Sequence, residues 1–70
     1  MEAVREAVLV HGVAAVAYAA QVQRQTVYRW VRGDTVPAAD KLHALVDAGM
    51  LTRAQAAAMV PETVRRLLSD

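Results

Sequence analysis

The stretch VAAVAYAAQVQRQTVYRWVRG, Val13 to Gly33, contains two runs of helical spacing joined by a short polar break. In the first run the apolar residues recur three or four positions apart: Val13, Val16, Ala17 and Ala20. This spacing places them on one face of a helix. Gln21 to Gln23 interrupts the pattern, and a second helix is predicted from about Arg24 to Arg32, closed by Gly33. Two short helices joined by about three residues are typical of a helix-turn-helix, here at about residues 13–32.

The sequence on the N-terminal side of this stretch predicts one more helix, over residues 2–10. Helical spacing recurs here, with Val4, Ala7, Val8 and His11 at positions i, i+3, i+4 and i+7, before Gly12 interrupts it. The charged and apolar residues of this segment alternate, with no basic start followed by a cleavage site. We therefore expect no signal peptide.

Further helices are predicted on the C-terminal side. Pro37, with Thr35 or Val36 before it, is expected to open a fourth helix that stops at Gly49. Thr52 to Gln55, TRAQ, matches a capping box at the start of a fifth helix reaching about Met59. Pro61 begins a short sixth segment. No alternating run suggests a strand, so residues 1–70 are expected to form a single domain, an all-α compact bundle of five to six short helices.

The residue types of the central stretch meet the packing requirements of a helix-turn-helix. Ala17 is small enough for the place where the two helices cross, and Val22 supplies an apolar side chain after the sharp turn. Val27 and Trp30, three positions apart, can seat the second helix on the first. Trp30 is expected in the core, as the one very large side chain of a chain rich in alanine and valine.

The segment VAAVAYAAQVQRQTVYRWVRGDTVP resembles the helix-turn-helix of Cro and lambda-repressor-type DNA-binding domains. The resemblance is strongest over TVYRWVRGDTVP, Thr26 to Pro37, and it extends from Gly12 to about Leu51. It implies that a first and a fourth helix pack around the motif of a phage-type transcriptional regulator. Two positions depart from the family. Gln21 stands at the sharp turn, where glycine is usual, and Val13 replaces a glutamine that can touch a phosphate.

The second helix of the motif is expected to carry a DNA-contacting surface. At about 100° per residue, four polar residues share one face, opposite the apolar face of Val27, Trp30 and Val31: Gln25, Tyr28, Arg29 and Arg32. Gln25 can pair bidentately with adenine, and Arg29 with guanine. The other expected DNA contacts are base edges or flanking backbone for Gln23 and Arg24, and phosphates for Thr26 and Arg32.

Two features of this face allow more than one interpretation. Tyr28 can contact a thymine methyl group or a sugar, or it can lie across the neighbouring helix. The arginines can contact DNA, or they can form an ordinary solvated face. Residues 21–33 contain three arginines and no acid, whereas the whole chain has a net charge of +1. This local concentration of positive charge favours an anionic partner.

Several classes of function are not expected from this composition. The chain has no cysteine, and its two histidines, His11 and His43, are far apart, which fits capping or partly buried groups better than zinc ligands. Glycine-rich phosphate loops and catalytic triads are absent, so we expect no enzyme, no cofactor and no small-molecule ligand. No run of about 18 apolar residues predicts a membrane span, and we expect a cytoplasmic protein of a bacterium or a phage-infected host.

Two functions are consistent with these features. The first is a Cro-type phage or prophage repressor that binds double-stranded DNA as a homodimer. Residues 53–68 can supply the dimer surface or can fold back as core. The second is a protein-interaction module that keeps the helix-turn-helix fold, such as an antitoxin-like partner or a polymerase-binding phage factor.

Overall fold

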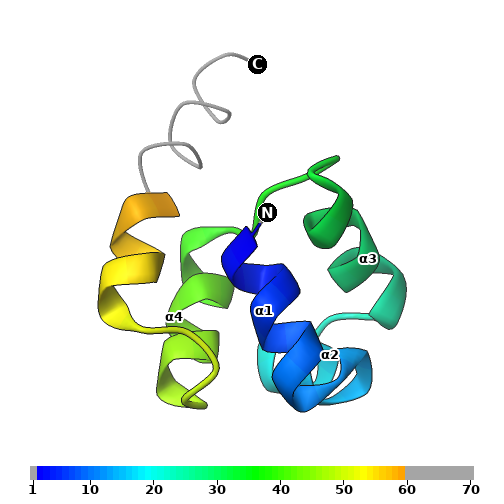
Figure 1. Ribbon diagram of the computed structural model, residues 1–70, viewed down its shortest axis with the longest axis horizontal. Helices are drawn as coiled ribbons and strands as arrows, with labels where there is room; N and C mark the ends of the chain where they lie inside the picture. Colours follow the sequence, from blue (N-terminus) through cyan, green and yellow to red (C-terminus); the bar gives the residue numbers. More distant parts are fainter. Residues whose placement is uncertain (1, 60–70) are drawn as a thin grey trace.

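The computed structural model describes residues 2–59, and five helices account for most of that range (Figure 1). Four of them are α1 (Glu2–His11), α2 (Val13–Ala20), α3 (Arg24–Arg32) and α4 (Ala39–Asp47). Residues 53–59 form the fifth. No residue from 2 to 59 lies in a strand, so the predicted all-α class is confirmed. The predicted sixth segment lies outside the described residues.

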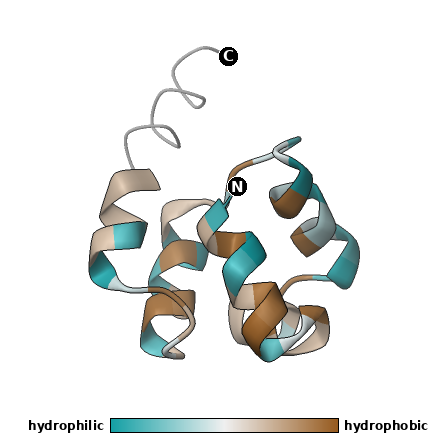
Figure 2. Ribbon diagram, in the orientation of Figure 1, coloured by the Kyte–Doolittle hydropathy of each residue, from teal (hydrophilic) through white to brown (hydrophobic). Residues whose placement is uncertain are grey.

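Each helix contributes to one apolar core. Six of its side chains, all valine or larger, expose at most 3% of their surface: Val4, Val16, Val27, Trp30, Leu42 and Leu45. The helix α2 lies at the centre of the packing, because it contacts α1, α3 and α4. On α3 the apolar residues face the other helices and the hydrophilic residues face outward (Figure 2). The predicted core position of Trp30 is therefore confirmed.

The junction between α1 and α2 is a sharp corner at Gly12. Its φ of 90° and ψ of 151° lie in a region that favours glycine strongly. The two helix axes are bent by 113° there. No single described helix is long and apolar enough to cross a membrane. The helices α1 and α2 reach the required length and apolar composition only when they are taken together as this bent pair.

The start of α4 differs from the prediction. Pro37 was expected at the first helical position, but α4 begins at Ala39 and Ala38 is its N-cap. Ala38 has an extended conformation, with φ −66° and ψ 162°. Pro37 is buried, so it fills space between the helices and enters the fold before the helix begins. The prediction relied on the favourable position of proline in a first helical turn and did not consider its burial.

The capping box at the start of the 53–59 helix is confirmed. The N–H of Gln55 donates to Thr52 Oγ1 at 3.0 Å, and the N–H of Thr52 donates to Gln55 Oε1 at 2.9 Å. These reciprocal bonds satisfy two backbone donors that a helix start leaves unpaired. They fix the point at which the chain turns back from α4 to cover α1.

Candidate nucleic-acid interface

The turn between α2 and α3 is held by backbone hydrogen bonds. Gln21 has the left-handed conformation, with φ 57° and ψ 47°. Its N–H donates to the Tyr18 carbonyl at 3.1 Å, and the N–H of Val22 donates to the Ala17 carbonyl at 3.0 Å. This pair of bonds is the Schellman motif of a helix end, which glycine usually completes. A glutamine occupies the strained position here.

Apolar contacts position α3 on α2. Ala17 is buried and Val22 is half-buried after the turn, as their residue types predict. Val27 is fully buried and Trp30 exposes only 3% of its surface. The helix α3 packs on both α2 and α1. These contacts fix its rotation about its own axis and therefore the direction of its polar face.

The predicted polar face of α3 is exposed. Gln25, Arg29 and Arg32 are exposed, and Tyr28 exposes 49% of its surface. Both interpretations of Tyr28, a DNA contact or a side chain across the neighbouring helix, remain open at that exposure. The structure thus brings four predicted site residues together on one side of one helix, opposite Val27 and Trp30.

The first turn of α3 carries the other three predicted residues. Gln23, the N-cap, and Arg24, the first helical residue, are both exposed. Thr26 is half-buried, and its N–H donates to the Gln23 carbonyl at 3.0 Å. No side chain caps this helix start. The free backbone N–H groups and the positive end of the helix dipole at this terminus favour a nearby anion, and Arg24 adds a positive charge there.

The arginines of α3 differ in their partners. Within residues 2–59, neither Arg24 nor Arg29 forms an ion pair. Arg32 does: its Nε lies 3.0 Å from Asp34 Oδ2, and both side chains are largely exposed. The sequence prediction missed this pair, although an acid directly after the helix-ending glycine was a visible signal.

The histidines were predicted to be capping or partly buried groups, and the structure excludes partial burial. His11 and His43 are both exposed, and His11 lies in the last turn of α1. His43 Nε2 lies 3.7 Å from Asp47 Oδ2, one helical turn further along α4. Among the described residues there is no group of three histidine, cysteine or carboxylate side chains that could hold a metal ion.

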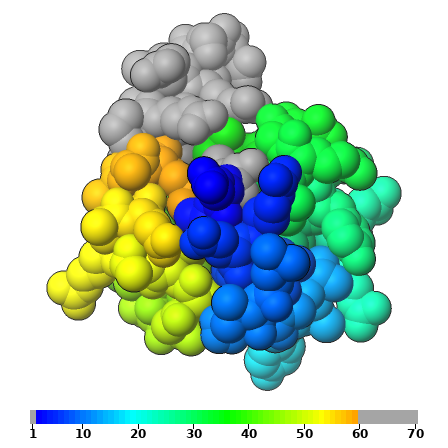
Figure 3. Space-filling view, in the orientation of Figure 1, coloured from blue at the N-terminus to red at the C-terminus, as the bar shows by residue number. Residues whose placement is uncertain are grey.

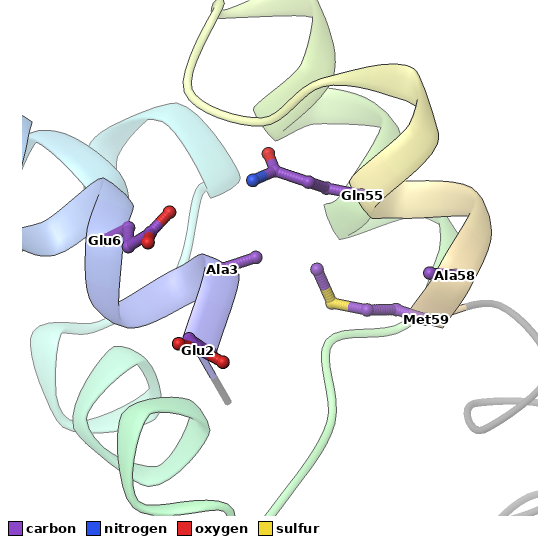
Figure 4. A pocket seen from close by; sticks show the side chains of 6 residues that line it. All are labelled: Glu2, Ala3, Glu6, Gln55, Ala58 and Met59. Carbon is purple, nitrogen blue, oxygen red and sulfur yellow. The ribbon is translucent and has the colours of Figure 1, made fainter.

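A hollow of about 320 Å³ lies between α1 and the 53–59 helix (Figure 4). Its lining combines two carboxylates, one amide and three apolar side chains: Glu2, Glu6, Gln55, Ala3, Ala58 and Met59. The polar groups that line it are these two carboxylates and one amide. The exposed face of α3 gathers four of the predicted site residues and is the stronger candidate site.

The 53–59 helix and α3 lie at opposite edges of the molecule (Figure 3). In that view the yellow and orange residues of the 53–59 helix form one side, and the teal and green residues of α3 form the other.

Comparisons of the chain with protein-family models, curated proteins and solved structures found no match.

Proposed function

We propose that this chain is a sequence-specific DNA-binding transcriptional regulator that inserts α3 into the major groove. The observation that carries the proposal is the orientation of α3: its glutamine and arginine side chains are exposed, while Val27 and Trp30 anchor the opposite face. A recognition helix needs both a rigid seat on its neighbour and an exposed row of hydrogen-bonding side chains.

Two residues are proposed to recognise bases. Gln25 offers a carboxamide that can pair with adenine N6 and N7, and Arg29 offers a fork that fits guanine O6 and N7. They are four residues apart, which is about 6 Å along the helix axis. Both side chains project from the same face within about one helical turn, so the two recognised bases should lie within a few base pairs of each other.

The remaining contacts are proposed to position the protein on the duplex. Gln23 and Arg24 extend from the start of α3, where they can reach a base edge or the flanking phosphates. Thr26 and Arg32 are proposed as phosphate contacts. Arg32 is the weaker of these, because its guanidinium is already paired with Asp34.

A homodimer is part of this proposal. One copy would make only a few phosphate contacts, and affinity at physiological salt rises steeply with the number of such contacts. A Cro-type repressor dimer would bind a pseudo-palindrome with half-sites about 34–36 Å apart. Residues 60–68 of the proposed dimer surface lie outside the described residues. Met59 belongs to the core, which leaves it little surface for a second copy.

A protein-interaction module is the second candidate, and a specific observation favours it. Three large side chains on α1 and α2 are highly exposed, Leu9 at 78%, Val10 at 76% and Tyr18 at 86%. Exposed aliphatic and aromatic side chains of this kind suit a protein partner better than DNA. An antitoxin-like partner or a polymerase-binding phage factor would use such a surface.

Binding to random-sequence duplex DNA distinguishes the two candidates. Fluorescence anisotropy between 50 and 200 mM salt should show binding that weakens as salt increases, because each phosphate contact releases counterions. Arg24→Ala removes an exposed cation proposed to reach the flanking phosphates and should weaken this binding. Arg5→Ala, which removes an exposed arginine on α1, should leave it close to the parent. An absence of salt-dependent binding at 50 mM would favour the interaction module.

A further inference from the structure

Asp34 is fixed in place beside the polar face of α3. Gly33 turns the chain back with a φ of 82°, and the N–H of Asp34 then donates to the carbonyl of Arg29 at 3.0 Å. The N–H of Gly33 donates to the Trp30 carbonyl at 3.1 Å. These two bonds form a Schellman motif, so the backbone of Asp34 is tied to the helix that it follows.

The side chain of Asp34 reaches that same face. Its Oδ2 accepts from Arg32 Nε at 3.0 Å, and the two side chains expose 58% and 61% of their surface. Arg32 shares its face with Gln25 and Arg29. A carboxylate therefore stands at the C-terminal end of the surface proposed to meet DNA.

Helix stability does not account for this carboxylate. The C-terminal end of a helix carries partial negative charge, so an acid placed there is unfavourable. An exposed ion pair offsets little of that effect, because solvent screens it. A neutral residue at position 34 would close the helix with the same backbone bonds. The carboxylate is exposed beside Arg32, where it changes how Arg32 meets an anion.

We infer that Asp34 determines specificity by restraining Arg32 from binding phosphate, an inference that rests on the proposed function. A phosphate that approaches Arg32 also approaches the Asp34 carboxylate, and the pair together carries no net charge. Sequence-independent affinity depends on the number of phosphates that the protein neutralises. Asp34 removes much of one such contact and leaves the base contacts of Gln25 and Arg29 intact. Binding to random DNA falls, and the ratio of specific to nonspecific affinity rises.

The substitution Asp34→Asn tests this inference, with Asp40→Asn as its matched control. Asp40 is also exposed and lies 3.8 Å from a neighbouring cation, Lys41, but on α4. Anisotropy on random-sequence duplex DNA should show tighter binding by D34N at 50 mM salt. The loss of affinity between 50 and 200 mM should be roughly three-fold larger than for the parent, as expected for one added phosphate contact. D40N should behave like the parent.

A double-mutant cycle separates action through Arg32 from a general charge effect. In an Arg32→Ala background, D34N should change neither the affinity nor the salt dependence. Thermal melting followed by circular dichroism confirms that each variant is folded. If D34N matches D40N while the parent binds DNA, the inference about Asp34 is wrong and the proposed function stands. Tighter binding by D34N in the R32A background also overturns it. A parent that binds no DNA refutes the proposed function itself.

Discussion

Arg29 has the clearest chemical role expected of any residue on α3. It is exposed, it has no ion-pair partner within residues 2–59, and it projects from the face opposite Trp30. A guanidinium that is not held by a carboxylate can direct both donors of its fork to guanine. Gln25, one turn earlier, offers the corresponding pair of groups to adenine.

Substitution of Arg29 or Gln25 by alanine should relax base preference at one position each. The expected loss of discrimination is about 1–3 kcal/mol for a bidentate contact. The measurement is a competition between the preferred duplex and duplexes with a single base pair changed. Arg5→Ala removes an exposed arginine on α1 and should leave the preference unchanged. If R29A and Q25A keep the full base preference of the parent, α3 is not the recognition helix.

Gln21 illustrates a residue-scale strain in the fold. It takes the same place in the Schellman motif after α2 that Gly33 takes after α3, with φ 57° and 82° respectively. Apart from its chain neighbours, no described residue has an atom within 4 Å of a Cβ built at Gly33, so a side chain there would be strained by the backbone conformation and not by crowding.

Gln21→Gly should therefore stabilise the protein. Glycine removes the strain of the left-handed conformation, but it also raises the conformational entropy of the unfolded chain. The net increase in the free energy of unfolding is expected to be about 0.5–1 kcal/mol. Gly33→Ala, the reverse change in the equivalent motif, should destabilise it by about 1 kcal/mol. Urea unfolding followed by circular dichroism measures both. A Q21G variant less stable than the parent would mean that the Gln21 side chain contributes more than its backbone conformation costs.

At the scale of elements, the start of α4 lacks a side-chain cap, as do the starts of α2 and α3. Its N-cap is Ala38, which has no side-chain acceptor for the free N–H groups of the first turn. The 53–59 helix, in contrast, has the reciprocal Thr52 and Gln55 bonds. Ala38 already has the extended backbone that a capping residue adopts.

Ala38→Ser should stabilise the protein by roughly 0.5–1 kcal/mol, because the hydroxyl can accept from an N–H of the first turn. Ala48→Ser, at the C-cap of the same helix, is the control and should give no comparable gain, since the groups unpaired there are carbonyls. Thermal and urea unfolding of the two variants give the comparison. Equal effects at both ends would show that capping is not the cause.

The element boundaries show what sequence patterns can predict. The bounds of α3 were predicted correctly, because a polar break precedes it and a glycine with positive φ ends it. The start of α4 was wrong by two residues, because Pro37 has two favourable environments, a first helical turn and a buried extended segment. The local conformational preference of proline does not distinguish these two environments. Only the packing of the whole chain does.

The candidate site was predictable to a similar degree. Helical periodicity places Gln25, Tyr28, Arg29 and Arg32 on one face, and the structure confirms that placement. Periodicity says nothing about how an exposed side chain bends, so the contact between Arg32 and Asp34 was missed. That contact depends on the turn at Gly33, which brings the acid back beside the helix.

At the scale of the whole molecule, the small core determines which surface remains available. Alanine and valine supply much of the core, and Trp30 is its largest side chain. Because α2 is enclosed by α1, α3 and α4, the outer side of α3 stays uncovered by the other described helices. The 53–59 helix packs at the opposite edge (Figure 3). The fold therefore presents the polar face of α3 at one end of the molecule.

Selection of bound fragments from a random pool of duplex DNA tests most directly whether that face recognises sequence. The protein should enrich a consensus in which an adenine and a guanine lie within a few base pairs of each other, since Gln25 and Arg29 project from the same face of α3 about one helical turn apart. For a dimer the element should recur as an inverted repeat about one helical turn away. Bound fragments with the same base composition at every position as the starting pool would contradict recognition by α3.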